Sequence, residues 1–156
     1  MARIFQLNIK TRTKEDLGVS KHPVLEAMLT EKGFEGDFNR YRTEKKNGSL
    51  DMAVLVLPFE QIMAYARWPV LPGNLGENIT TIGILYNMLA EEQQYKVGEA
   101  IIELTFQAQP CKKLGILHYV GANLKDFMQE LRNKRGWYAK VLQEGMVRKN
   151  DAFELV

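Results

Sequence analysis

Hydrophobic and polar residues alternate along several short stretches of the chain, and this alternation predicts β-strands. Phe5, Leu7 and Ile9 alternate with polar neighbours, which is the period-two pattern of a strand with one buried face. The run 52–57 is apolar throughout, as is typical of a strand buried on both faces. Further strands are predicted at 79–84, 102–106, 138–142 and 153–156. So many short strands, separated by turn signals, predict a mainly β fold.

Two other stretches repeat apolar residues at helical spacing. The first runs from Phe59 to Ala66 and stops before Pro69. The second covers 124–131 and follows Asn123, a suitable N-cap residue. A weaker helical pattern covers 86–96, and 45–49 has the composition of an exposed turn. We expect the two clear helices to cover the openings of a β-barrel rather than to bind a ligand.

The length and composition of the chain indicate one globular domain. Its 156 residues are 46% hydrophobic and 26% charged, close to the average for a globular protein. This apolar content is enough to offset the chain entropy that is lost on folding. We therefore predict a single domain over residues 1–156: a closed or partly open β-barrel with a few peripheral helices.

The charge and hydropathy of the chain argue against some partners. The net charge is only +2, from 21 basic and 19 acidic side chains, so the totals do not indicate a nucleic acid or membrane partner. No apolar run approaches the ~18 residues that cross a bilayer. The first ten residues are too polar for a signal peptide. We expect a cytoplasmic protein whose one cysteine stays a thiol.

That cysteine, Cys111, is the first candidate for chemistry. It follows the predicted strand 102–106, and Pro110 should end the strand's ladder because proline lacks an N–H. Lys112 and Lys113 next to the thiol favour its thiolate, which is the form that attacks sulfur and binds metals. The alternative is a small buried hydrophobe, which many free cysteines are.

Three further segments could bind an anion or a planar ring. The segment 72–79 has two glycines and two asparagines before a strand, so its N–H groups could face an anion, although a structural turn explains it as well. Arg40 and Arg42 suit phosphate, or they are solvated surface. Arg135 adjoins two aromatic residues, Trp137 and Tyr138, which could stack on a heterocycle or enter the core. His22 and His118 lack metal-ligand spacing, and we expect satisfied surface or core histidines.

Taken in order, these segments resemble the MOSC family, which is the C-terminal domain of molybdenum cofactor sulfurases and also occurs as stand-alone bacterial proteins. The resemblance covers most of the chain, and its most specific feature is a lone cysteine after Gln109 and Pro110. The segments that carry it are 18–24, 33–37, 72–80, 97–100, 109–114 and 135–145. One difference is that the stretch 48–51 lacks the histidine found there in many family members.

The resemblance implies a β-barrel with a cleft that holds the cysteine. It implies that Cys111 carries sulfur as a persulfide or ligates molybdenum, and that the group bound is molybdenum cofactor (molybdopterin). The family is also associated with pyridoxal phosphate. The residues expected to contact the cofactor are Arg40, Arg42, Asn74, Gly76, Glu77, Asn78, Gln109, Lys112, Lys113 and Arg135. The difference at 48–51 puts the anion contacts of that stretch in doubt, and Arg40 and Arg42 are the candidates to replace them.

Several functions remain open on these grounds. The chain is expected to be a sulfur transferase or the cofactor-binding component of a molybdenum-dependent reductase. Its expected partners are a cysteine desulfurase, molybdoenzymes or cofactor-biosynthesis proteins. The alternative is a small β-barrel that binds without catalysis, either nucleic acid, which the near-neutral charge disfavours, or a protein of cofactor biosynthesis.

Overall fold

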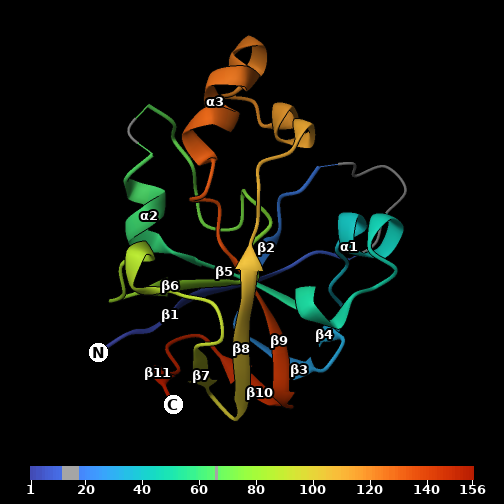
Figure 1. Cartoon of the computed structure of the whole chain (residues 1–156), viewed down its shortest axis with the longest axis vertical. Helices are drawn as coiled ribbons and strands as arrows, with labels where there is room; N and C mark the ends of the chain where they lie inside the picture. Colours follow the sequence, from blue (N-terminus) through green and yellow to red (C-terminus); the bar gives the residue numbers. More distant parts are fainter. Residues whose placement is uncertain (12–17, 66) are drawn as a thin grey trace.

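β-Strands make up most of the regular structure in the computed structural model, which describes residues 1–11, 18–65 and 67–156 (Figure 1). The strands are β1 (Arg3–Ile9), β2 (His22–Val24), β3 (Glu26–Thr30), β4 (Gly33–Phe34), β5 (Val54–Pro58), β6 (Ile79–Ile82), β7 (Gln94–Val97), β8 (Ala100–Gln107), β9 (Trp137–Gln143), β10 (Gly145–Arg148) and β11 (Phe153–Leu155). The helices are α1 (Arg40–Lys45), α2 (Phe59–Met63) and α3 (Leu124–Leu131), with short 3₁₀ turns η1 (Leu50–Met52), η2 (Tyr86–Met88), η3 (Lys112–Ile116) and η4 (Gly121–Asn123).

The strands form two sheets. An eight-stranded sheet has the order β11-β7-β8-β9-β5-β6-β1-β2, and a three-stranded sheet has the order β10-β3-β4. Within the described residues no continuous ladder closes the large sheet, but an isolated antiparallel bridge joins Arg3 to Ala152. Two backbone hydrogen bonds reinforce this junction, from Ile4 to Asp151 (2.8 Å) and from Phe153 to Ala2 (3.0 Å). The mainly β class is confirmed, and full closure into a barrel stays a prediction.

The first strand shows how a bulge changes which residues are buried. The alternation predicts that Phe5, Leu7 and Ile9 face the core, yet the fully buried apolar side chains are Ile4 and Leu7. The register of β1 against β6 shifts between Ile4 and Gln6. An extra residue at this point reverses the alternation, so both Ile4 and Leu7 point inward. The position of the strand is confirmed, but of the three residues predicted to face the core only Leu7 is fully buried.

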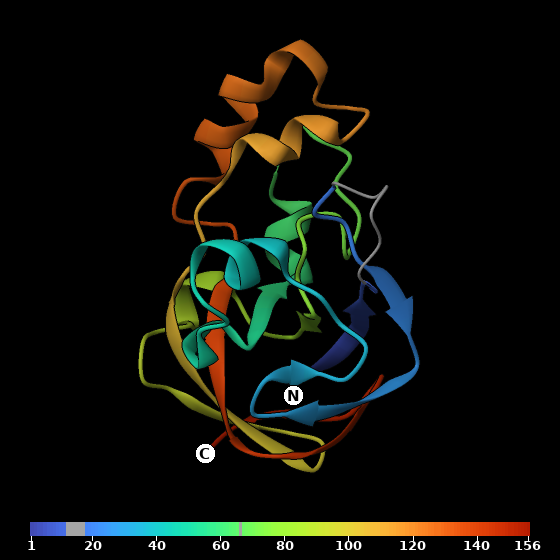
Figure 2. The same cartoon turned by 90° about the vertical axis from the view of Figure 1, so that its right-hand side faces the viewer.

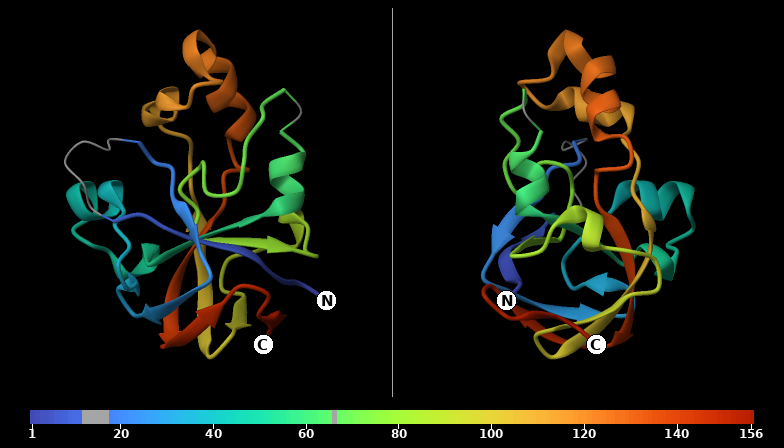
Figure 3. Two further views of the ribbon diagram at one scale, coloured as in Figure 1. Left: turned by 180° about the vertical axis from the view of Figure 1, so that it is seen from behind. Right: turned by 60° about the vertical axis from the view of Figure 1, so that its left-hand side comes forward.

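The buried residues form two main clusters. The larger lies among the strands and includes Ile4, Val56, Ile102 and Leu104. The second contains Tyr65, Trp68 and Phe127 with Leu114 of η3 and Leu131 of α3. Figures 2 and 3 show the segment from η3 to α3 as a separate lobe beyond one end of the strands. The core of this lobe meets the end of β8, and the junction between them positions the candidate site.

Three predictions need correction or completion. The helix predicted at 86–96 is wrong: the stretch forms η2 and then β7, because Gln94–Val97 pairs with β8 and β11. The helix predicted from 59 ends at Met63, and its last predicted residue, Ala66, lies outside the described residues. The helix over 124–131 is confirmed, although the Asn123 side chain makes no capping hydrogen bond. Among described residues no helix has the length and apolarity to cross a membrane.

Candidate functional site

A cleft of about 760 Å³ opens where the lobe meets the sheet. One wall is α1 with the residues just before it, and another is the end of β8 with the start of η3. Its lining residues are Lys10, Gly18, Val19, Lys21, Phe38, Asn39, Arg40, Tyr41, Glu44, Lys45, Lys46, Leu55, Leu75, Gly76, Phe106, Gln107, Ala108, Gln109, Pro110, Cys111, Lys112, Lys113, Arg135 and Tyr138.

Cys111 is placed in this cleft by the end of β8. The strand stops at Gln107, and Pro110 cannot continue the ladder because it has no N–H. Cys111 then takes an extended conformation directly before η3. Its side chain is half-buried, packs against the core of the lobe and lines the cleft. The predicted loop position at the strand's end is therefore confirmed, and the thiol has an open space beside it.

Arg135 fixes the backbone that leads to Cys111. Its guanidinium donates to the Gln109 carbonyl (2.7 Å) and to the Leu75 carbonyl (3.0 Å). The side chain is only 7% exposed. It therefore links the cysteine loop to the segment 72–78. Sequence reasoning proposed Arg135 as a phosphate donor, but two of its N–H groups already bind protein carbonyls.

The cleft brings together seven of the residues that the sequence singled out. They are Arg40, Gly76, Gln109, Cys111, Lys112, Lys113 and Arg135. Arg42, Asn74, Glu77 and Asn78 do not line it. The segment 72–78 approaches the cleft mainly through Leu75 and Gly76, and Gly73 instead packs closely on the backbone of Lys21, where an added Cβ would clash. Of the two aromatic candidates, Tyr138 lines the cleft and Trp137 packs against the sheet core.

Arg42 has a structural task outside the cleft. Its guanidinium donates to the carbonyls of Ser49 (2.7 Å), Gly48 (3.3 Å) and Lys32. These bonds hold the turn after α1 against the end of β3. A guanidinium with three protein acceptors is poorly placed to bind a phosphate as well.

Asn78 and Asn74 are likewise engaged within the protein. Asn78 accepts a hydrogen bond from the Leu55 N–H (3.1 Å) and donates to the Asp37 carboxylate (2.9 Å). Asn74 accepts from the Tyr119 hydroxyl (3.0 Å). Asp37 also pairs with Lys21, whose Nζ lies 2.7 Å from Asp37 Oδ2. This buried network joins β1, β5 and the segment before α1.

Glu77 is a buried carboxyl group close to the cleft floor. Within the described structure neither of its oxygens makes a hydrogen bond of good geometry. Burial raises its pKa to about 8, although Arg135, Lys21 and nearby backbone N–H groups of Gly73 and Glu77 itself act in the opposite direction. Sequence reasoning expected Glu77 to contact the cofactor, but the side chain lies behind the lining residues.

Sequence reasoning missed several residues of the cleft. Tyr41 and Phe106 line it and are 50% and 44% exposed. Lys45, the last residue of α1, and Lys46, which follows it, also line the cleft. The pair Lys45-Lys46 was visible in the sequence, but only the fold brings it opposite Cys111. His22 and His118 are exposed and lie outside the cleft, in agreement with the expectation of surface histidines.

Comparison with known proteins identifies the family. The family model "MOSC domain" matches residues 43–154, which is more than half of the chain and includes Cys111. The chain belongs to the MOSC family. The expected resemblance is thereby confirmed.

Two curated proteins and one solved structure are similar to the chain. It is 34% identical over 139 residues to Protein YiiM of Escherichia coli (strain K12), covering 84% of this chain and 59% of the relative. It is 29% identical over 147 residues to the uncharacterized protein YflK of Bacillus subtilis (strain 168), covering 92% and 65%. The chain thus spans about three fifths of the length of these relatives. The crystal structure of YiiM from Geobacillus stearothermophilus superposes with a TM-score of 0.76 at 26% identity, covering 100% of this chain and 75% of that one.

Proposed function

We propose that this MOSC protein binds molybdenum cofactor in the cleft and that Cys111 carries sulfur or ligates molybdenum there. The observation that supports this most is the half-buried thiol that lines an open cleft together with cationic side chains. A sulfur atom needs access to react, and a thiolate is a soft ligand that suits molybdenum and persulfide exchange.

The residues of the cleft fit a phosphorylated pterin. Lys112 and Lys113 adjoin Cys111, and Arg40 lines the opposite wall, so donors for a phosphate are at hand. Tyr138 and Phe106, whose ring centroids lie 5.3 Å apart, offer aromatic surface for a planar ring. When bound, the cofactor supplies two-electron redox chemistry. The protein's own residues bind it and orient it.

Tyr138 is the residue that we assign to stabilising the Cys111 thiolate by a hydrogen bond. Burial raises the pKa of its hydroxyl, with nearby Tyr41 and Cys111 acting in the same direction, while Arg135 and a hydrogen bond from Asn39 oppose this. The phenol therefore keeps its proton at neutral pH. Because Tyr138 and Cys111 line the same cleft, the protonated phenol can donate a hydrogen bond to the Cys111 thiolate that is released in sulfur transfer.

Tyr138→Phe is expected to slow sulfur transfer from a Cys111 persulfide to a small thiol acceptor by roughly 10- to 100-fold, because a hydrogen bond to a charged group, worth about 1.5–3 kcal/mol, is lost. The acceptor thiolate attacks the outer sulfur, the S–S bond breaks, and Cys111 leaves as a thiolate that needs stabilisation. The matched control is Tyr41→Phe, because Tyr41 also lines the cleft but is half exposed. Retention of cofactor should be unchanged in both variants. Equal rates in the two variants would exclude this role for Tyr138.

The function itself is tested by measuring what the protein carries. We expect the chain, purified from cells that make the cofactor, to contain pterin and molybdenum, and Cys111→Ser to lose the molybdenum. Incubation with a cysteine desulfurase and cysteine separates the two roles of the thiol: a sulfur carrier gains about 32 Da per sulfur atom, and Cys111→Ser gains nothing. The same extraction tests for pyridoxal phosphate, which the resemblance also implies. A folded protein with neither pterin, molybdenum nor a sulfur adduct contradicts the proposal.

A further inference from the structure

The cleft is far more cationic than the chain as a whole. The chain has 21 basic and 19 acidic residues, whereas the described lining has eight basic residues and one acidic residue, Glu44. The eight are Lys10, Lys21, Arg40, Lys45, Lys46, Lys112, Lys113 and Arg135. Such a concentration of one sign of charge in a concave surface attracts anions.

Four of these cations already have partners in the protein. Lys21 pairs with Asp37, and Arg40 lies 3.0 Å from Glu44. Arg135 donates to two carbonyls, and the Lys10 ammonium donates to the Gly18 carbonyl. Their positive charges are therefore partly compensated by the fold.

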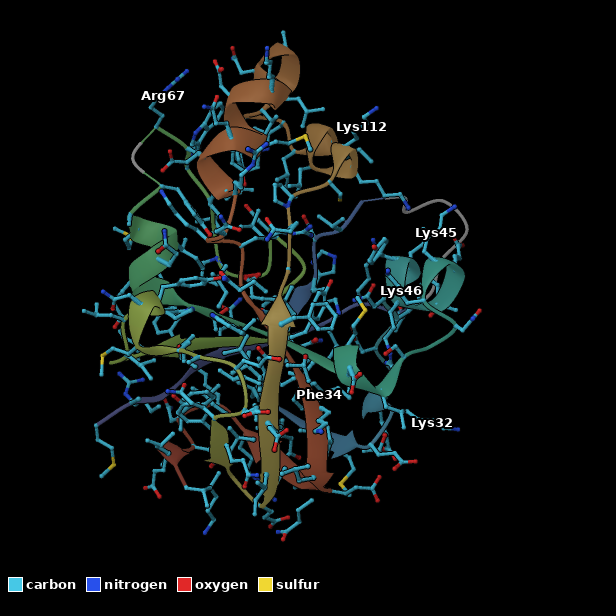
Figure 4. All side chains as sticks on the ribbon, in the orientation of Figure 1. Lys32, Phe34, Lys45, Lys46, Arg67 and Lys112 are labelled. Atoms are coloured by element: carbon cyan, nitrogen blue, oxygen red, sulfur yellow. The ribbon has the colours of Figure 1, made fainter. Side chains whose placement is uncertain are left out.

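The other four are lysines from two segments. They are Lys45 and Lys46 at the end of α1, and Lys112 and Lys113 in η3. None of them forms an ion pair with any residue that the structure describes. Figure 4 shows Lys45, Lys46 and Lys112 on the same side of the molecule. The two pairs thus contribute four positive charges to one cleft.

The charge of a single phosphate group is smaller than the charge of the four lysines. A phosphate monoester carries about two negative charges at neutral pH, which the pair Lys112-Lys113 balances. Lys45 and Lys46 on the other wall are exposed as well, so their ammonium groups remain available to attract a second phosphate group of the same ligand. A ligand with at least one further phosphate group would balance them.

Both walls of the cleft also expose aromatic surface, through Tyr41 of α1 and Phe106 of β8. Tyr41 is 50% exposed and Phe106 is 44% exposed, although large aromatic rings are usually well buried. The Lys46 ammonium lies 5.7 Å from the centroid of the Tyr41 ring. An aromatic platform beside lysines suits a ligand that joins a base to phosphates.

We propose that the cleft binds a nucleotide-type ligand that carries an aromatic base and at least two phosphates. Lys45 and Lys46 contact its phosphates, and Tyr41 and Phe106 contact its base. This inference shares with the proposed function only the cleft in which the ligand binds. The ligand is either a nucleotide substrate or a form of the cofactor that carries a nucleotide, and both share this chemistry.

Calorimetric titration of the whole chain at low salt tests the proposal with ADP, AMP, pyrophosphate and orthophosphate. We expect ADP to bind at least 10-fold more tightly than AMP, and pyrophosphate at least 10-fold more tightly than orthophosphate. The double variant Lys45→Ala/Lys46→Ala should weaken ADP binding at least 10-fold. The control Lys96→Ala/Lys149→Ala removes the same charge from exposed positions outside the cleft and should change it less than 2-fold. Phe106→Leu should weaken ADP but not pyrophosphate.

Three results would overturn the proposal: equal affinities for pyrophosphate and orthophosphate, equal effects of the two double variants, or tighter binding of a single-stranded oligonucleotide than of ADP. Cys111→Ser should bind ADP normally, so failure of this test and failure of the sulfur or molybdenum test are separate results. Mass spectrometry of ligands released from the denatured protein distinguishes the sources. A nucleotide in equal amount with pterin indicates an extended cofactor, and a nucleotide alone indicates a substrate.

Discussion

Replacing Asp37 with alanine is expected to lower the free energy of unfolding by about 3–5 kcal/mol, the range found when one partner of a buried ion pair is removed. Asp37 and Lys21 are 2.7 Å apart, and their side chains are only 8% and 4% exposed. Burial already lowers the pKa of Lys21, and Asp37 opposes that effect. Without the carboxylate the ammonium is buried and unpaired, and the Asn78 amide and the Lys10 N–H lose their acceptor. Urea unfolding at neutral pH measures the change.

Two comparisons show whether burial is the cause of this loss. Glu44→Ala removes a carboxylate of the same charge from the ion pair between Glu44 and Arg40, whose side chains are 43% and 24% exposed. This substitution should lower the free energy of unfolding by less than about 1 kcal/mol. Asp37→Ala/Lys21→Met removes both charges and should regain a large part of the stability lost in Asp37→Ala. If Asp37→Ala costs no more than Glu44→Ala, the pair is not the buried structural link described above.

The strands with clear hydrophobic patterns could be predicted from sequence, and short or irregular strands could not. The apolar run at 52–57 is almost entirely buried as β5 with its preceding turn, because neighbours cover both of its faces. By contrast β2, β3 and β4 have two to five residues with little alternation. Their pairing with distant strands, such as β3 with β10, decides their structure. Such non-local pairing leaves no periodic signal in a short segment.

The candidate site was predictable around Cys111 and much less so on the opposite wall. Pro110 and the preceding strand were enough to place the thiol at a strand's end. The tasks of Arg42 and Asn78 were not predictable, because arginine and asparagine bind protein carbonyls and amides as readily as they bind ligands. Their partners, Ser49 and Asp37, become neighbours only through the fold.

Glu77 is expected to make the protein less stable as the pH rises from about 4.5 to 8. In the unfolded chain its pKa is near the ordinary value of 4.5, and in the folded protein burial raises it to about 8. Below pH 4.5 the carboxyl is protonated in both states, so it contributes no pH dependence. Between the two values the unfolded chain gives up the proton and the folded protein keeps it, which favours unfolding at about 1.4 kcal/mol per pH unit.

From pH 5 to pH 8 this difference amounts to roughly 3–4 kcal/mol, and Glu77→Gln should remove it because an amide does not ionise in this range. The variant should therefore match the wild type at pH 5 and exceed its stability at pH 8, as measured by urea unfolding at several pH values. Glu91→Gln, at an exposed position, makes the same chemical change and should leave the pH dependence as it is. The charged groups around Glu77 are Arg135 and Lys21. Tyr65 and Tyr119 are also close, and a charge on Glu77 raises the pKa of both hydroxyl groups. If Arg135 and Lys21 compensated the carboxylate fully, its pKa would not be raised, and Glu77→Gln would be no more stable than the wild type at pH 8.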